Sequence, residues 1–474
     1  MADHPSLTPP PTILPLLDPT SNPWSITGLT NTSQPLLRPF ALGAAHAGRV
    51  RRLYLDVFAS NHGGSEEFWY TTTSAYREIN VYIDGCLAAA FYPALVVYTG
   101  GICPLLWRPL VSLLALDIPA YRLDITAFAG VLNDGSAHTF SFNVVDGDPP
   151  KSSGVWYIDP VLILELDSAP GARYSGAVDG ASCLSPSAVA AQRVVRVDGE
   201  TGSTVGSMQF TVNGTNTRSE AEPQRYAPPH TQILIATTCS QLSLHCSTHN
   251  IRTKKCTQAC PQKVASLPRS RRYSHSYTLA AENRQPKNGP TAGTMSTLIS
   301  STDPQSGHRV EDAQTWRYSV ADDSSYDKLS FLLKAKVSLA KERSKTVYRG
   351  DGEGAVLGLA LSQNNSGLYN RSLTNHTLIH AEGNNSTESF HFFAGSALGG
   401  QAGTAIAAPT ARHDGGGGSS CYTRDITAAG GHVTRDVVNA VPVDTQFPCY
   451  AFISQMDSFT GLRLCGNDFC GFLR

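Results

Sequence analysis

An acid, an imidazole and several aromatic side chains stand together at residues 61–70, which read Asn-His-Gly-Gly-Ser-Glu-Glu-Phe-Trp-Tyr. A carboxylate in such a setting can act as a general acid or base, because its neighbours adjust how strongly it holds a proton. Glu67 directly precedes the aromatic residues, whose rings can serve as platforms for sugar faces. The alternative is an ordinary surface loop with solvated acids and an aromatic lid over the core.

Patterns typical of β-strands flank this segment on both sides. Residues 52–59 and residues 77–84 alternate between apolar and polar side chains, as strands with one buried face do. The apolar members are Leu53, Leu55 and Val57, and then Ile79, Val81 and Ile83. We therefore expect the segment to connect two strands of one antiparallel sheet, where a loop holds functional groups on a rigid scaffold.

Further motifs follow in a fixed order along the chain. They are Arg-Glu-Ile-Asn-Val-Tyr-Ile-Asp-Gly at 77–85, Tyr-Thr-Gly-Gly-Ile-Cys-Pro-Leu-Leu-Trp-Arg-Pro at 98–109, Ala-Tyr-Arg-Leu-Asp-Ile-Thr at 120–126, Asn-Asp-Gly-Ser-Ala-His at 133–138 and Val-Trp-Tyr-Ile-Asp at 155–159. Taken together, they resemble the plant-type peptide N-glycanase A family, whose members hydrolyse the amide between N-acetylglucosamine and asparagine. The resemblance is close from about residue 51 to residue 167 and looser to residue 188 and in the C-terminal third.

The resemblance implies roles for four residues of the first segment. Glu67 matches the catalytic acid of the family's second domain. By position, His62 could orient the substrate, Trp69 could stack on the sugar, and Arg77 could hold Glu67 or a carbonyl group. The structural alternatives are loop packing for His62, a core position for Trp69 and solvation at a strand end for Arg77.

A second loop matches the family near the same rim. We expect it to bind substrate together with the first segment, and its glycines would let another backbone or a ligand come close. Its residues are Thr99, Gly100, Gly101, Trp107 and Arg108.

The N-terminal part departs from the family pattern. Family members resemble a tandem of β-sandwiches, with an active site between two jelly rolls and an Asp–Arg pair supplied by the first. About fifty residues precede the match here, and the first forty contain nine prolines, so we expect an extended, unpaired segment at 1–47. We also expect a chain that lacks the first jelly roll to hydrolyse glycopeptides poorly on its own.

The sequence gives mixed signals about the cellular compartment. Asn-X-Ser/Thr sequons predict glycosylation in the secretory pathway. They lie at Asn31, Asn213, Asn364, Asn370, Asn375, Asn384 and Asn385. The N-terminus shows no signal-peptide pattern, and a truncation that removed the signal with the first domain would reconcile the two observations.

Charge and cysteine content exclude several classes of partner. With a net charge of −1 and 16% charged residues, the chain has no general footprint for nucleic acid or anionic lipid. Eleven cysteines are too few for a disulfide scaffold, although Cys86 and Cys103 could pair, as could Cys421 with Cys449 and Cys465 with Cys470. A zinc site is the alternative interpretation of Cys239, Cys246, Cys256 and Cys260. The spacing of Cys239 and Cys246 is too wide for a ligand pair, so no metal or cofactor is predicted.

Two long stretches have an unusual distribution of charged residues. Residues 86–107 are uncharged over transmembrane length, yet Pro93, Pro104 and a Gly-Gly pair favour a buried strand and loop over a membrane helix. Residues 239–288 carry nine Lys or Arg against one acid, which favours a disordered insertion at 218–292 over a nucleic-acid arm.

We therefore predict an all-β protein. A jelly-roll-like sandwich spans 48–168, and a second β domain begins at 169–217 with a hairpin around the turn at residues 198–202. The insertion follows, and a β-rich region covers 293–474. The first functional hypothesis is a secreted peptide N-glycanase-like amide hydrolase acting on N-glycopeptides or glycoproteins with acid–base side chains alone. The alternative is a non-catalytic glycan-binding or structural glycoprotein.

Overall fold

The computed structural model describes residues 11–16, 28–30, 36–62, 67–71, 75–98, 101–115, 118, 120–146, 155–169, 171–220, 269–286, 289–303, 307–326, 329–348, 353–375, 378–398 and 418–440. Strands dominate this part of the chain, and its helices span at most seven residues. The all-β prediction is therefore confirmed. The four cysteines of the zinc alternative, and Cys449, Cys465 and Cys470, lie outside the described residues.

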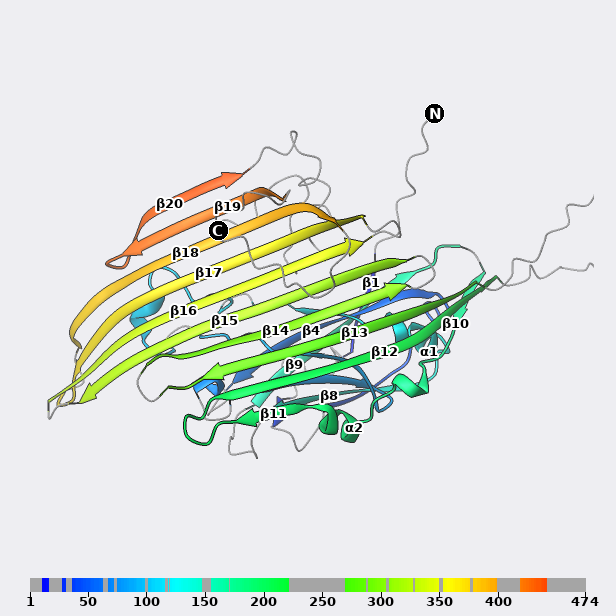
Figure 1. Ribbon diagram of the computed structural model, residues 1–474, viewed down its shortest axis with the longest axis horizontal. Helices are drawn as coiled ribbons and strands as arrows, with labels where there is room; N and C mark the ends of the chain where they lie inside the picture. Colours follow the sequence, from blue (N-terminus) through cyan, green and yellow to red (C-terminus); the bar gives the residue numbers. More distant parts are fainter. Residues whose placement is uncertain are drawn as a thin grey trace, which may run out of the picture.

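Two antiparallel sheets form a sandwich in the first third of the chain (Figure 1). Sheet A has the order β1–β9–β4–β7, with β2 also beside β9, and sheet B has the order β3–β8–β5–β6. The strands of sheet A are β1 (Thr12–Pro15), β2 (Gly28–Thr30), β4 (Val50–His62), β7 (Tyr121–Asp124) and β9 (Val155–Leu166). Those of sheet B are β3 (Leu36–Phe40), β5 (Arg77–Ile83), β6 (Cys86–Phe91) and β8 (His138–Asp146).

The alternating side chains of the two sheets make the core between them. Leu53, Leu55 and Val57 of β4 are fully buried, and so are Phe140 and Phe142 of β8. Every second side chain of a strand points to the same face, so the predicted apolar stripe lines the inside of the sandwich. The sequence pattern therefore placed the inward face of β4 correctly.

The prediction that residues 52–59 and 77–84 belong to one sheet was wrong. β4 pairs with β7 and β9 in sheet A, whereas β5 pairs with β6 and β8 in sheet B. Alternation reveals which face of a strand is buried but not which strand lies beside it. The connection that carries Glu67 therefore crosses from one layer of the sandwich to the other.

The expectation of an unpaired N-terminal segment was also wrong for its described residues. β1 and β2 pair with β9, and β3 pairs with β8. Pro15 in β1 and Pro39 in β3 fit this arrangement, because both strands lie at sheet edges, where a missing N–H donor is tolerated.

The rest of the described chain builds one large antiparallel sheet, sheet C. From β12 onward each strand pairs with the next in sequence, and β10 and β11 lie beside β12 (Figure 1). The strands are β10 (Ala172–Ser175), β11 (Val194–Val197), β12 (Thr204–Glu220), β13 (Arg269–Arg284), β14 (Thr291–Asp303), β15 (His308–Tyr326), β16 (Ser330–Tyr348), β17 (Glu353–Ser372), β18 (Leu378–Leu398), β19 (Gly418–Ala429) and β20 (His432–Ala440). The predicted hairpin around residues 198–202 is confirmed by the pairing of β11 with β12.

Part of the predicted insertion is ordered strand. Residues 269–284 form β13, in which Tyr273, His275, Tyr277 and Leu279 are buried at every second position. This alternation was present in the sequence, but the many arginines and serines between the buried residues obscured it. Residues 221–268 lie outside the described part of the chain.

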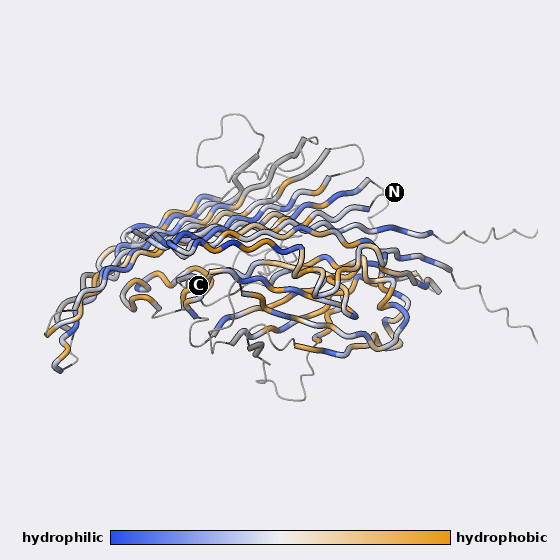
Figure 2. Tube along the Cα trace, turned by 60° about the horizontal axis from the view of Figure 1, so that its bottom comes forward, coloured by the Kyte–Doolittle hydropathy of each residue, from blue (hydrophilic) through white to orange (hydrophobic). Residues whose placement is uncertain are grey.

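Sheet C covers the sandwich at the edge where β6 and β7 lie. Figure 2 shows it arching over the two smaller sheets and extending beyond them. Tyr277 of β13 donates to the carbonyl oxygen of Asp124 at 3.1 Å, and the Tyr92 N–H donates to Thr297 of β14 at 3.4 Å. Sheet C therefore shares a continuous core with the sandwich.

Short helices fill the connections. They are η2 (Trp69–Thr71), η3 (Pro104–Trp107), η4 (Thr126–Phe128), α1 (Ala129–Leu132), η5 (Gly180–Ser182) and α2 (Pro186–Gln192). Within the described residues, no helix is long and apolar enough to cross a membrane. The uncharged stretch from residue 86 instead begins with β6 and contains η3, as the buried strand and loop interpretation predicted.

The disulfide prediction for Cys86 was wrong in its partner. Cys86 is bonded to Cys183, while Cys103 is free and buried. The bond ties β6 to the segment before α2, where the Leu87 N–H also donates to the Leu184 carbonyl oxygen at 2.9 Å. The sequence offered no sign that residues 97 positions apart would meet there.

Candidate functional site

Glu67 lies half-buried in the turn that leads from β4 to η2. The next residues, Phe68, Trp69 and Tyr70, pack against one another, with ring centroids 6.3 Å apart for Trp69 and Tyr70 and 6.4 Å apart for Phe68 and Tyr70. Since Trp69 and Tyr70 are fully buried, the aromatic run anchors the turn and leaves the carboxylate at its rim.

Tyr98 is the titratable neighbour that the structure adds to Glu67. Its hydroxyl lies 3.0 Å from the Ser60 hydroxyl at the end of β4. Burial, and to a lesser degree the negative charge of Glu67, raise the pKa of Tyr98 above its usual value. The phenol therefore stays protonated at neutral pH and can donate a hydrogen bond beside the carboxylate.

The two loops singled out in the sequence meet. A Cβ on Gly101 would lie 3.8 Å from the Phe68 ring, so the backbone at Gly101 runs directly past the residue after Glu67. The indole N–H of Trp107 donates to the Gly101 carbonyl oxygen at 2.8 Å, which fixes the second loop on itself. Trp107 is buried and Arg108 is exposed.

Arg77 and Trp69 form a buried pair behind the turn. The guanidinium carbon of Arg77 lies 5.8 Å from the centre of the Trp69 ring, and its Nη1 donates to the Tyr76 carbonyl oxygen at 2.7 Å. Trp69 is 0% exposed and Arg77 is 4% exposed. In this conformation Trp69 presents no face to a sugar, so the geometry favours the core alternative for Trp69 and a supporting position for Arg77.

Sheet C supplies a second wall next to the turn. Tyr70 packs edge-on against Tyr318 of β15 at 5.8 Å, and Asn283 of β13 donates to the Tyr70 carbonyl oxygen at 3.2 Å. Burial first, and then the charges of Glu67 and Asp322, raise the pKa of the Tyr70 hydroxyl. Carboxylates from the sandwich and from sheet C thus lie near the same buried phenol.

Asp322 belongs to the face of β15 that meets the sandwich. Trp316, Tyr318 and Val320 are buried on that face, and Asp322 continues their alternation into an exposed position. In the same cross-strand row, Gly367 of β17 touches Leu106 of η3, since a Cβ there would lie 3.3 Å from Leu106. The cross-strand row that contains Asp322 and Gly367 therefore passes beneath the loop that carries Gly101 and Trp107.

Several predicted site residues are only partly placed. The backbone of His62 pairs with Val155 at the end of β4, but its side chain, like the whole of Thr99 and Gly100, lies outside the described residues. The structure thus brings Glu67, Gly101 and Trp107 into one region, with Trp69 and Arg77 behind it.

The sequence did not single out Tyr98 and Asp322, which the structure places near the turn that holds Glu67. Tyr98 opens the second family motif, and Asp322 lies two residues beyond the alternating Trp316-Arg-Tyr-Ser-Val320 pattern. Extending that alternation would have placed Asp322 on the inward face. Only the three-dimensional structure shows that this face lies against the turn that holds Glu67.

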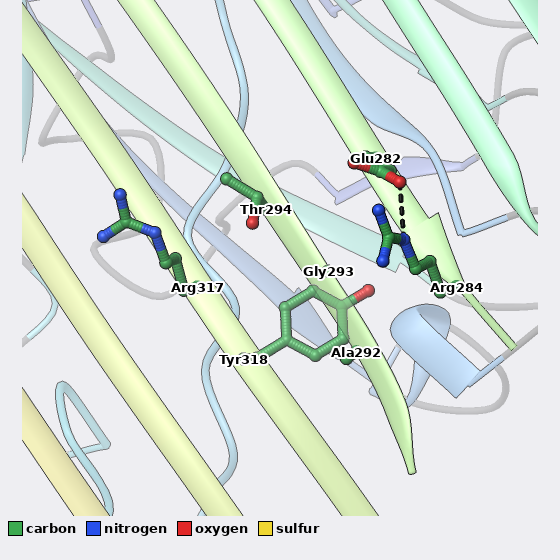
Figure 3. A pocket seen from close by; sticks show the side chains of 7 residues that line it. All are labelled: Glu282, Arg284, Ala292, Gly293, Thr294, Arg317 and Tyr318. Carbon is green, nitrogen blue, oxygen red and sulfur yellow. Dashed lines mark hydrogen bonds and ion pairs between the residues drawn. The ribbon is translucent and has the colours of Figure 1, made fainter. Parts of the chain in front are cut away.

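A separate pocket of about 300 Å³ opens on β13, β14 and β15 (Figure 3). Its residues are Glu282, Arg284, Ala292, Gly293, Thr294, Arg317 and Tyr318. The Tyr318 ring leans over Gly293, where a Cβ would come within 2.6 Å of it. Both arginines are neutralised, Arg284 by Glu282 and Arg317 by Glu342, each at 2.6 Å. This pocket offers no uncompensated charge to a ligand.

No metal site emerges from the described residues, which contain no group of three or more His, Cys, Asp or Glu side chains arranged to hold an ion. Of the predicted glycosylation sites, Asn364, Asn375 and Asn385 are exposed, while Asn213 and Asn370 are half-buried. The side chain of Asn384 and the whole of Asn31 lie outside the described part.

Comparison with known proteins now connects this geometry to a family. Residues 43–172 match the family model described as peptide N-acetyl-beta-D-glucosaminyl asparaginase amidase A. The segment is similar to the peptide-N4-(N-acetyl-beta-glucosaminyl)asparagine amidase A of Prunus dulcis, with 37% identity over 132 residues. That alignment covers 24% of this chain and 22% of the relative, so this chain spans about a fifth of the curated relative it matches. No solved structure matches the chain.

Proposed function

We propose that this protein acts on N-glycopeptides or glycoproteins as a peptide N-glycanase-type amide hydrolase in the secretory pathway. The observation that carries the proposal is that the segment matching the family model, residues 43–172, contains both loops, which meet at Phe68, the residue after Glu67. The name of the Prunus dulcis relative specifies the same amide, between N-acetylglucosamine and asparagine.

The chemistry needs a proton acceptor and a proton donor. Water adds to the side-chain carbonyl carbon of asparagine, and the C–N bond then breaks with loss of the glycosylamine. Glu67 would take a proton from the water and return it to the leaving nitrogen, a role worth about 10²–10⁴-fold in rate. The neutral Tyr98 phenol would donate a hydrogen bond to the carbonyl oxygen as negative charge develops on it.

The surroundings of Glu67 support this division of roles. Glu67 is half-buried and therefore accessible from the rim, while Trp69 and Tyr70 below it are buried and hold the turn in place. Arg77 stacks on Trp69 and would position the turn without touching the substrate. Asp322 is the second carboxylate that we assign to the site, from the opposite wall.

The test is hydrolysis of a glycopeptide by the whole chain, with binding measured in parallel. We expect slow release of the glycan, a loss of about 10²–10⁴-fold in Glu67→Gln and retained glycopeptide binding by that variant. Glu200→Gln, in the exposed turn between β11 and β12, is the matched control and should leave the rate unchanged. Turnover that survives Glu67→Gln would contradict the assignment of Glu67.

The alternative is a glycan-binding protein without catalysis, in which the two loops that meet at Phe68 would hold the sugar while the buried Trp69 and Arg77 would not touch it. Binding of the glycopeptide without hydrolysis would support this alternative. Absence of both binding and hydrolysis would contradict both functions.

A further inference from the structure

A pocket of about 430 Å³ lies at the other end of β4 from Glu67. It is formed by the turn before β4, by the connection between β9 and β10, and by β10 itself. Its residues are Ala44, Ala45, Arg49, Ser168, Ala169, Gly171 and Arg173. Since β4 has 13 residues, about 40 Å of strand separates this pocket from Glu67 at roughly 3.3 Å per residue. The pocket is therefore distinct from the proposed catalytic region.

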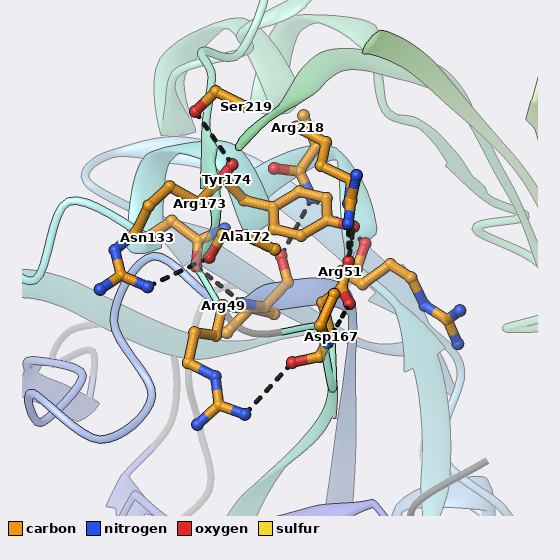
Figure 4. A network of polar contacts seen from close by, with 12 residues as sticks. Arg49, Arg51, Asn133, Asp167, Ala172, Arg173, Tyr174, Arg218 and Ser219 are labelled. Atoms are coloured by element: carbon orange, nitrogen blue, oxygen red, sulfur yellow. Dashed lines mark hydrogen bonds and ion pairs between the residues drawn. The ribbon is translucent and has the colours of Figure 1, made fainter. Parts of the chain in front are cut away.

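Two guanidinium groups line the pocket, and their hydrogen bonds within the described part of the chain go to backbone carbonyl oxygens (Figure 4). Arg49 donates to Ala45 at 3.3 Å and to the backbone oxygen of Asp167 at 3.2 Å. Arg173 donates to the Ala172 carbonyl oxygen at 3.1 Å. Within the described residues, neither guanidinium forms an ion pair with a carboxylate.

The nearby carboxylates are already engaged elsewhere (Figure 4). The Asp167 carboxylate accepts from the Ala169 N–H at 2.8 Å, the Tyr174 hydroxyl at 2.7 Å and Arg218 at 2.8 Å. Burial alone would raise the pKa of Asp167, but these hydrogen bonds lower it to about 2.

A second acid, Glu165, pairs with Arg51 at 3.0 Å. The described side chains of the cluster thus include four arginines, at 49, 51, 173 and 218, and two acids, at 165 and 167, which is an excess of two positive charges; the side chain of Glu220, whose backbone pairs with Ala172, lies outside the described residues.

The arginines of the other pocket show the contrast, since Arg284 and Arg317 each face a carboxylate at 2.6 Å. A planar guanidinium carries donors spaced to match an oxyanion, and two such groups in one pocket can share it. The Arg173 side chain passes close to the backbone of Gly48, where the φ of +74° favours glycine and a Cβ would lie 3.1 Å from Arg173 Cδ.

We propose that Arg49 and Arg173 form an oxyanion-binding site that recognises one carboxylate, phosphate or sulfate group. The group can belong to an acidic sugar of a glycan or to a free inorganic anion, and both present the same planar or tetrahedral oxygens to the guanidinium donors. The site would bind a charged group of a glycoprotein far from the amide bond that is cleaved at Glu67. This proposal does not depend on the proposed hydrolysis.

The test is calorimetric titration of the whole chain at low ionic strength with inorganic phosphate, sulfate, glucuronate and N-acetylneuraminate, and with uncharged N-acetylglucosamine as the negative probe. We expect millimolar or tighter binding of at least one anion, none of the uncharged sugar, and weakening as salt is added. A sugar acid that binds at least tenfold more tightly than phosphate identifies a glycan as the source, and the reverse identifies a free anion. Comparable affinities support a site for either.

Matched variants decide whether these two arginines are responsible. Arg49→Gln and Arg173→Gln should each weaken binding tenfold or more, whereas Arg196→Gln, an exposed arginine of β11, should not. Thermal unfolding controls for misfolding, and Arg173→Lys should retain part of the affinity because it keeps the charge without the planar fork. Unchanged affinity in the two glutamine variants, or no anion binding at all, overturns the proposal.

Discussion

Arg193, the residue that follows α2, forms a bidentate ion pair with Glu78 in β5. Its Nη2 donates to Oε1 at 2.5 Å and its Nε to Oε2 at 3.2 Å, while the Glu78 side chain is 0% exposed. The Tyr76 hydroxyl donates to the same carboxylate. This buried ion pair therefore links the segment after the sandwich to the middle of sheet B.

Removing one partner of this ion pair should be strongly destabilising. We expect Arg193→Ala to lower the free energy of unfolding by about 3–5 kcal/mol, because Glu78 would stay buried without its counter-charge. Urea denaturation of the whole chain measures this, with Arg196→Ala as the exposed control. The double variant Glu78→Gln/Arg193→Met should lose less, and a larger loss than in Arg193→Ala would contradict the explanation.

His138 should make stability depend on pH. Its Nδ1 lies 2.7 Å from Asp84 and its Nε2 lies 3.0 Å from Asp134. Desolvation lowers the pKa of His138, but hydrogen bonds to the two carboxylates outweigh it and raise the pKa above its usual value. The stabilisation is therefore complete below about pH 6.5, the pKa of an unfolded histidine, and is lost as pH rises through the higher folded-state pKa.

The measurement compares thermal unfolding of the wild type and His138→Gln. We expect the wild type to have the larger advantage at about pH 5.5 and a smaller one at about pH 8.5. The contribution of Asp134 to stability changes with pH in the opposite direction. Hydrogen bonds from Ser136 and His138 outweigh desolvation and lower the pKa of Asp134, so its stabilising contribution is lost only as pH falls below about 4. His432→Gln, at the exposed start of β20, should show no such trend.

Gly214 in β12 should tolerate no side chain. A Cβ there would meet the carbonyl oxygen of Ala127 in η4, where sheet C packs on the sandwich. We expect Gly214→Ala to cost about 1–3 kcal/mol of unfolding free energy through overpacking. The control Gly199→Ala places its Cβ in open space and should be nearly neutral. Equal unfolding midpoints for the two variants would contradict this account of the interface.

Asp322→Asn should slow glycopeptide hydrolysis if the second wall takes part in the reaction. We expect a tenfold or greater loss in kcat/KM with unchanged thermal stability, because Asp322 is exposed and a neutral amide fits the same place. Asp323→Asn is the matched control, since it lies on the opposite face of β15 and is equally exposed. A similar rate in both variants would remove Asp322 from the site.

The exposed sequons predict glycosylation when the chain is expressed with an added secretion signal. Asn364 on β17, Asn375 in the following turn and Asn385 on β18 are accessible to a bulky glycan. We expect an endoglycosidase to increase gel mobility, and replacement of these three asparagines by glutamine to remove most of that shift. A secreted chain whose mobility does not change would contradict the prediction.

Local patterns predicted the inward face of β4 and the hairpin of β11 with β12, because both depend on residues close in sequence. They did not predict that β4 and β5 lie in different sheets, or that Cys86 would meet Cys183. Such pairings depend on how distant segments meet in space, and period-2 alternation carries no information about the neighbouring strand.

The site shows the same limit. The family motifs identified Glu67 and the loop at Gly101, which lie together in the structure. The burial of Trp69 could not be predicted, because an aromatic residue in a loop has the same local pattern whether it is covered or exposed. Asp322 is 255 residues from Glu67, so only the packing of two sheets relates them.

The topology of sheet C gives the two halves of the protein different routes to their native state. From β13 to β18 every pairing joins consecutive strands across a short connection, so each hairpin can form locally and template the next. In the sandwich, β1 pairs with β9 and β3 with β8, which requires segments a hundred or more residues apart to find each other. We therefore expect refolding to show early protection of amides in β14–β17 and slower protection in β1 and β3, with the sandwich setting the overall rate.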